Sequence, residues 1–208
     1  MRGFRYLAAA AAITGLLIGP AVTAASAATS QGAEARAAGV HLRGGTTAVT
    51  TAPGVASALL QHGIVPRAIW PGSERVLYGR NGPAVRFAFP VTGGLVTLSP
   101  LGGNIDHDGG IAFRNTRNGK TIEVSQFIID LTHGDLTGIV NGNPAARVPL
   151  FRLGLSHAQV AVGRHLVKAR GIVLALTWVA AKALDAALGT RLFSAGLELG
   201  TARTVLRF

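Results

Sequence analysis

The sequence contains no cysteine, and aromatic residues make up only 6% of its 208 positions. Without cysteine the chain forms no disulfide and offers no thiol for a lipid anchor. A stable fold must therefore come from a packed hydrophobic core. Acidic residues are also scarce, with nine Asp and Glu against 20 Lys and Arg, so few carboxylate pairs are available for glycosidase chemistry.

Several motifs that carry known chemistries are missing. The chain has no G-x-S-x-G turn, no H-E-x-x-H helix, no P-loop and no G-x-G-x-x-G segment after a predicted strand. A Ser-His-Asp constellation leaves no such local trace, because its members need not be adjacent in sequence. The sequence therefore indicates no particular enzyme class.

The first 27 residues have the three parts of a secretory signal peptide. Arg2 and Arg5 precede an apolar stretch at residues 7–18, and small residues at 25–27 provide a cleavage site. We expect cleavage after residue 27, no transmembrane segment in the mature chain, and a secreted or cell-envelope-associated protein. Residues 28–45 are small and polar without a sustained period, which predicts a flexible leader.

The chain is strongly basic, with a formal net charge of +11 that would become +9 after loss of Arg2 and Arg5. Such a charge favours anionic partners such as cell-wall polymers or lipid headgroups. The arginines stand singly, with no cluster and no interleaved aromatic residues. We therefore expect no nucleic-acid partner.

The pattern of residues 46–208 predicts a single β-rich domain of the α+β class. Apolar residues at helical spacing, ended by Gly63 and Gly189, predict two short helices over 54–62 and 178–188. Short β-branched segments separated by Gly, Pro and Asn predict strands, which are expected at 46–51, 64–70, 84–91, 94–101, 109–115, 120–131, 135–142, 146–153, 156–163 and 166–177. We expect a predominantly antiparallel sheet or sandwich carrying the two helices.

Asn118-Gly119 is the strongest local turn signal, since a two-residue hairpin turn needs residues that tolerate positive φ. A turn centred there pairs Phe113 with Val124 and, further out, His107 with Asp130. That His–Asp pair is a candidate general base or ligand contact, although it would also suit a structural role. The second half of segment 120–131 is apolar on both faces, which predicts either a bulge or a cover on both sides.

A polar cluster at residues 104–110 resembles the first half of a calcium-binding loop. Asn104, Asp106 and Asp108 alternate as the oxygen ligands of such a loop do, and Gly109 would permit its sharp turn. The twelfth position is Asn115, where that loop needs a bidentate glutamate. The same residues are also typical of a plain turn between two strands, so the cluster is a weak metal candidate.

Residues 85–142 resemble the strand layout of secreted HtaA-type haem-binding domains. The matching positions, which surround the I-x-H-x-G-G turn and the TIEVSQFIIDL strand, are Gly103, Ile105, His107, Gly109, Phe127, Asp130, Gly134 and Leu136. The resemblance implies haem as a cofactor and a tyrosine ligand, and Tyr78 stands in the corresponding order after Trp70 and Ser73. Their spacing differs from that of the family, and the family's phenylalanine is missing. Exported bacterial proteins without a known role share the same turn.

These observations lead to a main functional hypothesis and two alternatives. The main hypothesis is an exported, non-enzymatic binding or structural protein of the cell envelope whose ligand the sequence does not identify. The alternatives are a haem-binding protein of HtaA type and a hydrolase that uses His107 and Asp130. The candidate ligand-binding residues are Tyr78, Asp106, His107 and Asp130.

Overall fold

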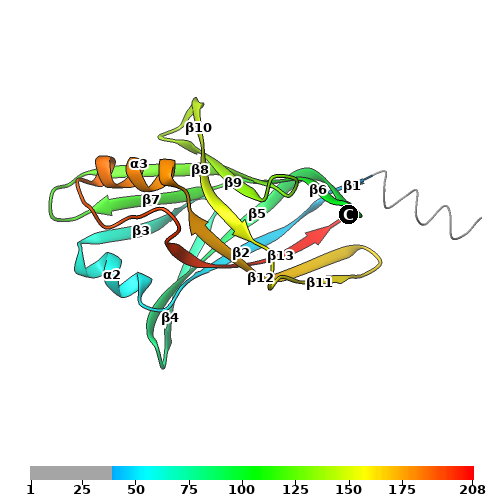
Figure 1. The fold of residues 1–208 in the computed structure, drawn as a ribbon, viewed down its shortest axis with the longest axis horizontal. Coiled ribbons are helices and arrows are strands. Elements are labelled where there is room, and N and C mark those ends of the chain that lie inside the picture. The colour runs from blue at the N-terminus through cyan, green and yellow to red at the C-terminus, as the bar shows by residue number, and fades with distance from the viewer. Residues whose placement is uncertain (1–38) are drawn as a thin grey trace, which may run out of the picture. The chain divides into compact units, whose positions relative to one another are not determined.

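The computed structural model describes residues 39–208. The predicted signal peptide and residues 28–38 of the predicted leader lie outside this range. The described chain consists of strands with two short helices, shown in Figure 1. The strands are β1 (Val40–His41), β2 (Gly44–Thr51), β3 (Ile64–Ile69), β4 (Ser73–Gly79), β5 (Gly82–Leu98), β6 (Leu101–His107), β7 (Gly110–Asn115), β8 (Thr121–Asp130), β9 (Asp135–Val140), β10 (Asn143–Gly154), β11 (Gln159–Val162), β12 (Leu166–Leu176) and β13 (Glu198–Arg207). The helices are α2 (Val55–Gln61) and α3 (Trp178–Leu188).

Eight of the strands close into a barrel with antiparallel pairing throughout. Their order around the ring is β5, β2, β13, β12, β10, β9, β8 and β6, and β6 pairs with β5 on one side and with β8 on the other. The remaining strands extend this ring at its edges. The predicted antiparallel sheet with two short helices is confirmed, and a barrel describes it more specifically than the predicted sheet or sandwich. Pairing of β6 with strands on both sides joins the sheet to itself instead of leaving two stacked layers.

The barrel interior is lined by apolar side chains from alternate positions of its strands. Three phenylalanines form its aromatic centre. The rings of Phe87 and Phe89 stack with centroids 6.4 Å apart, and the ring of Phe127 meets Phe89 edge-on at 5.0 Å. All three are almost completely buried. This interior is the hydrophobic core that a chain without disulfides requires.

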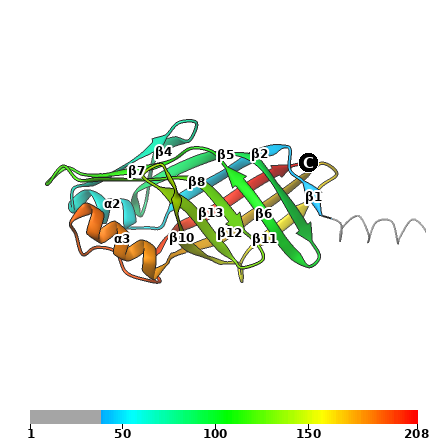
Figure 2. The same cartoon turned by 90° about the horizontal axis from the view of Figure 1, so that it is seen from above.

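Both helices lie at the same end of the barrel, while the C-terminus and β1 lie at the other end (Figure 2). The two helices were predicted by their apolar spacing and terminal glycines, and both predictions are confirmed. Thr177 caps α3 by accepting a hydrogen bond from the Ala180 amide, and Gly189 ends it in a left-handed conformation. Within residues 39–208 neither helix has the length and apolarity to cross a membrane.

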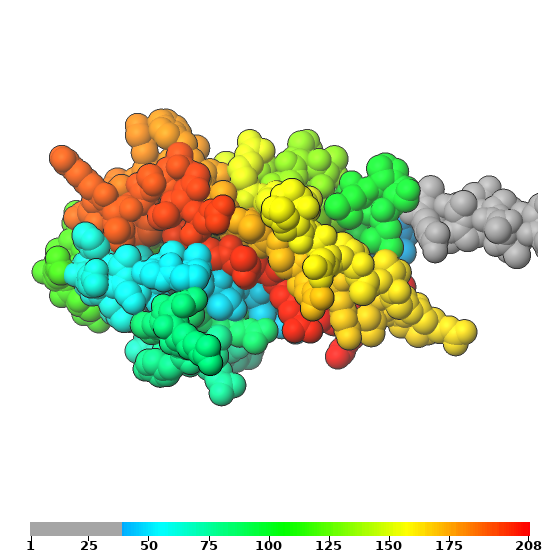
Figure 3. Space-filling view, turned by 60° about the horizontal axis from the view of Figure 1, so that its bottom comes forward, coloured from blue at the N-terminus to red at the C-terminus, as the bar shows by residue number. Residues whose placement is uncertain are grey.

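The loop that follows α3 packs beside α2 and helps to close this end of the barrel. Figure 3 shows the orange-red residues after α3 next to the cyan residues of α2. Leu59 of α2 and Phe193 of the loop line both the barrel interior and a groove on the outer surface. These two side chains therefore separate the interior from solvent at the helix end.

The predicted leader extends too far into the folded chain. Its last residues form β1 and the start of β2, and Gly45 pairs with Val91 of β5. A Cβ atom on Gly45 would lie 2.0 Å from the carbonyl oxygen of Val205. Gly45 is therefore needed where β2 approaches β13 closely.

The hairpin between β7 and β8 exists, but its register differs from the prediction by two residues. Phe113 pairs with Ile122 instead of Val124, and a longer loop replaces the two-residue turn. The reason is tertiary: the side-chain amides of Asn115 and Asn118 both donate to the carbonyl oxygen of Leu188, at 2.9 Å each. The loop thus caps the C-terminus of α3 instead of forming a minimal turn. Because the shift is even, each side chain keeps its predicted face.

A bulge interrupts β8 at its midpoint, as the apolar pattern of this strand predicted. Gln126 has a φ of 49°, and the pairing with β9 shifts between Ser125 and Ile128. The buried positions accordingly change from Ile122 and Val124 to Phe127 and Ile129. The bulge therefore accounts for the pattern, and the helix α3 also packs against β8.

Candidate functional site

The predicted site residues do not gather in one place. His107 is buried inside the barrel with 5% exposure, whereas Tyr78 is 87% exposed near the tip of the β4–β5 hairpin. Asp106 is half-buried on β6 and accepts a hydrogen bond of 2.8 Å from the side-chain amide of Asn104. Asp130 lies at the end of β8, where its carboxylate faces solvent.

The predicted pairing of His107 with Asp130 is wrong. Asp130 lies opposite Asn104, and its Oδ2 is 2.7 Å from Nδ1 of His133 in an exposed hydrogen bond. Hydrogen bonds from His133 hold the pKa of Asp130 below its usual value. The prediction assumed one continuous hairpin ladder. In the structure β6 and β7 follow each other along β8, but the two-residue shift of the hairpin and a further one-residue irregularity at Asp108 and Gly109 move Asp130 opposite Asn104.

The structure does not have the calcium-loop geometry. Asn104 and Asp106 lie in extended strand β6, and the carboxylate of Asp108 accepts a hydrogen bond from the amide of Gly109. Among residues 39–208, no three His, Asp or Glu side chains lie together in a way that could hold a metal ion. Asp108 and Gly109 form an irregularity between β6 and β7, and the chain does not reverse there, because both strands pair antiparallel with β8.

His107 is instead part of a buried network that joins three strands of the barrel. Its Nε2 lies 2.7 Å from the hydroxyl oxygen of Thr47 on β2, which lies 2.8 Å from the hydroxyl oxygen of Thr204 on β13. Its Nδ1 faces the carbonyl oxygen of Phe127 at 3.3 Å. The bulge in β8 leaves Phe127 out of the ladder with β9, so its carbonyl is available to the imidazole.

The partners of the imidazole determine its tautomer. A carbonyl oxygen can only accept, so Nδ1 carries the proton and Nε2 is an acceptor. The Thr47 hydroxyl then donates to Nε2, and the Thr204 hydroxyl donates to the oxygen of Thr47. Burial in the apolar interior lowers the pKa of His107 to about 4, against smaller opposing effects of the Phe127 carbonyl and the Asp106 charge. The imidazole is therefore neutral at physiological pH.

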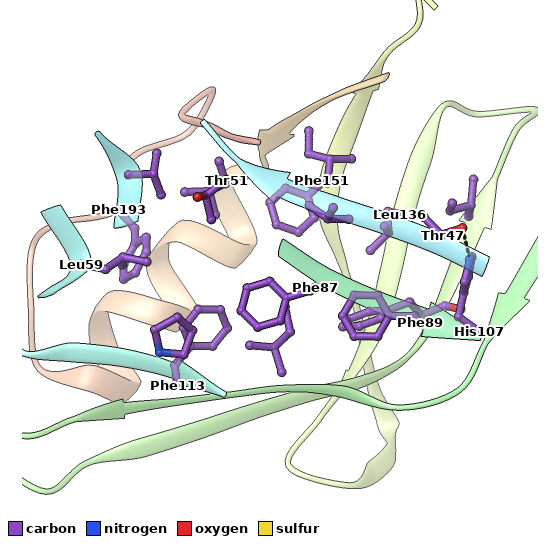
Figure 4. Close-up of a pocket in the computed structure, with 18 residues that line it drawn as sticks. Thr47, Thr51, Leu59, Phe87, Phe89, His107, Phe113, Leu136, Phe151 and Phe193 are labelled. Atoms are coloured by element: carbon purple, nitrogen blue, oxygen red, sulfur yellow. Dashed lines mark hydrogen bonds between the residues drawn. The ribbon is translucent and has the colours of Figure 1, made fainter. Parts of the chain in front are cut away.

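Two apolar chambers meet at this network. The helix chamber, about 80 Å³ in volume, extends from His107 and Thr47 to Leu59 and Phe193 beside the helices. Figure 4 shows His107 and Thr47 at one end and Leu59 and Phe193 at the other, with the rings of Phe87, Phe89 and Phe151 between them. The far chamber, about 190 Å³, lies toward the opposite end and includes Thr47 and Thr204 in its wall. Thr47 therefore forms part of the partition between the chambers.

This arrangement is suited to binding rather than to hydrolysis. The Thr47 hydroxyl and His107 Nε2 have the separation of a nucleophile and its base, but an imidazole with a pKa of about 4 is a weak base at neutral pH. No charged side chain lines either chamber. An apolar interior with a few hydroxyl groups is what small-molecule sites commonly offer.

Tyr78 lies on a separate surface groove of about 250 Å³, between the β4–β5 hairpin and the chain that enters α2. Its walls include Thr51, Pro53, Leu77 and Arg80 as well as Tyr78. The groove thus combines a phenol with a guanidinium. It does not include His107, Asp106 or Asp130, so the four predicted site residues do not share a cavity.

Sequence reasoning missed Thr47 and Thr204. Both occur in β-branched runs, where threonine is an ordinary strand former, and they are 157 positions apart. Only closure of the barrel between β2 and β13 brings them together. No local pattern distinguishes them from the other threonines of these strands.

Comparisons with known proteins support the fold. No family model and no curated protein matches the sequence. Among solved structures, the chain is similar to the C-terminal domain of HtaA from Corynebacterium glutamicum, with a TM-score of 0.52 and 14% identity over 79% of this chain and 98% of that one. A domain-swapped dimer variant of that domain matches with a TM-score of 0.48 and 13% identity, over 94% and 99% of the two chains. The first match confirms the distant resemblance to HtaA-type domains.

Proposed function

We propose that this protein is an exported, non-enzymatic binding domain whose barrel interior receives a small apolar ligand. The observation that carries the proposal is the pair of apolar chambers separated by a hydrogen-bonded, neutral polar network. An eight-stranded barrel is wide enough either to fill with side chains or to hold one small ligand. Here the side chains leave space at both ends of the network.

The sequence supports the proposed location. The signal-peptide pattern at residues 1–27 favours export, and the excess of basic residues favours attachment to anionic polymers or lipids of the envelope. Stability without disulfides is compatible with either location, since the core alone holds the fold. We place the protein at the cell envelope or outside the cell.

The binding proposal is tested by ligand-dependent stability. The purified chain is unfolded in the presence of single-ring hydrocarbons, naphthalene-sized molecules and fatty acids of increasing length. A ligand at 100 times its Kd should stabilise the folded state by about 2.7 kcal/mol. Chemical-shift changes of interior methyl groups would place the ligand inside the barrel. If no member of the series shifts the unfolding midpoint or these resonances, the proposal is wrong.

Haem is the second candidate ligand, favoured by the fold likeness to an HtaA domain and by the Tyr78 groove. A cavity of about 150 Å³ holds a single ring, so neither interior chamber has room for a porphyrin. The residues that would hold haem are instead Tyr78, whose phenol would ligate iron, and Arg80, whose guanidinium would face a propionate. Such a haem would remain largely exposed to solvent.

A haem titration distinguishes this candidate. We expect a Soret band that Tyr78→Phe weakens, while Trp70→Phe, a change at another exposed aromatic residue, leaves it unchanged. A flat titration of the unaltered chain removes haem from consideration. It leaves the apolar-ligand proposal untouched, because the two sites share no residue other than Thr51.

A further inference from the structure

The far chamber has the features of a ligand site that opens to solvent. Its wall is apolar apart from the hydroxyl groups of Thr47 and Thr204, and no charged side chain lines it. Two wall residues, Leu101 and Val160, are themselves 46% and 54% exposed. They form an apolar rim through which the chamber reaches the surface, between the β5–β6 hairpin and β11.

The hydrogen-bond directions in the network determine what the chamber offers a ligand. Because His107 Nε2 accepts, Thr47 must donate to it, and Thr204 must then donate to Thr47. The backbone carbonyl of Thr46 lies 3.5 Å from the Thr204 hydroxyl, which is at the limit of a hydrogen bond, so it does not compete for this proton. The Thr204 oxygen therefore keeps a lone pair with no donor partner among residues 39–208.

The size of the chamber restricts the ligand further. An apolar cavity of about 150 Å³ is known to accept benzene. The far chamber, at about 190 Å³, accommodates a single ring with a small substituent. A carboxylate or ammonium group would lose its hydration without meeting an opposite charge, which costs several kcal/mol.

We infer that the far chamber binds a small neutral molecule of about one ring, whose single hydroxyl or N–H group donates a hydrogen bond to Thr204. This inference rests on the proposed binding function and deepens it by naming the ligand class and the recognising atom. The polar network then serves two purposes. It satisfies His107, and it presents one oriented acceptor at the inner end of an apolar chamber.

The test compares three probes of nearly equal size with the full chain. p-Cresol carries a hydroxyl donor, 4-methylanisole has the same ring with an oxygen that cannot donate, and toluene has no oxygen. Calorimetry should show p-cresol binding about fivefold to tenfold more tightly than 4-methylanisole, the effect of one buried hydrogen bond. Nuclear Overhauser contacts from the p-cresol ring to the methyl groups of Leu101 and Val160 should locate it.

Variants separate the chamber from the acceptor. In Thr204→Val, p-cresol and 4-methylanisole should bind with about equal affinity, and toluene should still bind. Thr204→Ser should retain the preference for p-cresol. Val160→Trp should block all three probes, whereas Val162→Trp, a change at a similarly exposed residue of β11 outside the chamber wall, should not.

Each alternative outcome overturns the inference. Equal binding of p-cresol and 4-methylanisole, or a preference that survives in Thr204→Val, would show that Thr204 is not the acceptor. If Thr204→Val does not fold, the contacts of bound p-cresol decide instead, and their absence at Leu101 and Val160 places the ligand elsewhere. Binding of larger molecules in the helix chamber, with none of the three probes bound, would reject the inference and leave the proposed function standing.

Discussion

The hydroxyl oxygen of Thr47 lies 2.7 Å from Nε2 of His107, although the two residues are 60 positions apart. Thr47 belongs to β2 and His107 to β6, strands that are not neighbours in the barrel. The strand β2 pairs with one edge of β5, and β6 pairs with the other edge. Both side chains point toward the barrel interior. A buried imidazole without such partners would lose the free energy of its hydration, so the network is what makes a histidine acceptable at this position.

The first prediction concerns the pH dependence of stability. His107 has a folded-state pKa of about 4 against 6.5 for the free side chain, so the unfolded chain binds the proton more readily. Its contribution is fully present above pH 6.5 and is lost as the pH falls toward 4, by about 3 kcal/mol in total. Urea unfolding at several pH values should show this loss in the unaltered chain and a flatter profile in His107→Gln. Parallel profiles would show that His107 is not the responsible group.

A second prediction concerns the partner of the imidazole. Thr47→Val keeps the shape of the side chain but leaves Nε2 without a donor, which should lower the free energy of unfolding by about 1–3 kcal/mol. Thr46→Val, at an exposed position of the same strand, is the matched control and should change it by less than about 0.5 kcal/mol. An equal effect of the two substitutions would mean that the hydrogen bond does not stabilise the fold.

A third prediction concerns the loop that caps α3. Asn115 is 4% exposed and donates to the carbonyl oxygen of Leu188, so Asn115→Ala should destabilise the protein by about 1–3 kcal/mol. Asn118 donates to the same oxygen from a more exposed position, and Asn118→Ala should have a smaller effect. Hydrogen exchange should show faster opening of the last turn of α3 in both variants. Unchanged exchange in Asn115→Ala would contradict the capping role.

A fourth prediction concerns the bulge in β8. Gln126 has a positive φ that a side chain disfavours, so Gln126→Gly should raise the free energy of unfolding by up to about 1 kcal/mol. Gln126→Val should lower it, because a β-branched residue tolerates this conformation least. Thermal unfolding of the two variants measures the difference. A destabilised glycine variant together with a neutral valine variant would argue against the bulge.

Local patterns predicted much of the fold where the signal was confined to a few residues. The helices were found because apolar spacing and a terminal glycine occur within one segment, and the bulge was indicated by apolar residues on both faces of one strand. Four strands were missed, among them β1, which was assigned to the flexible leader. The β4 segment is mostly exposed and carries charged residues, β6 is rich in glycine and polar residues, and β13 alternates polar with apolar residues near the end of the chain. Their pairing with other strands gives them their conformation.

The candidate site was less accessible to sequence reasoning. His107 was identified as a residue of interest, but its partners were assigned from an uninterrupted hairpin register. The amides of Asn115 and Asn118 bind the end of α3 beside a two-residue register shift, and an irregularity at Asp108 and Gly109 shifts the register along β8 by one more residue. Both events depend on chain segments far from the hairpin, so no reading of the hairpin alone could give the register.

The sequence by itself determined which segments prefer strand or helix, the lack of disulfides and the basic charge, and it predicted an export signal, because each depends on the chemistry of neighbouring residues. The tertiary structure decided that β6 pairs on both sides to close a barrel, that His107 faces Thr47 and Phe127 instead of Asp130, and that two apolar chambers remain inside. Those features depend on contacts between residues tens to more than a hundred positions apart. Such contacts form only when the whole sheet closes and excludes water from its interior.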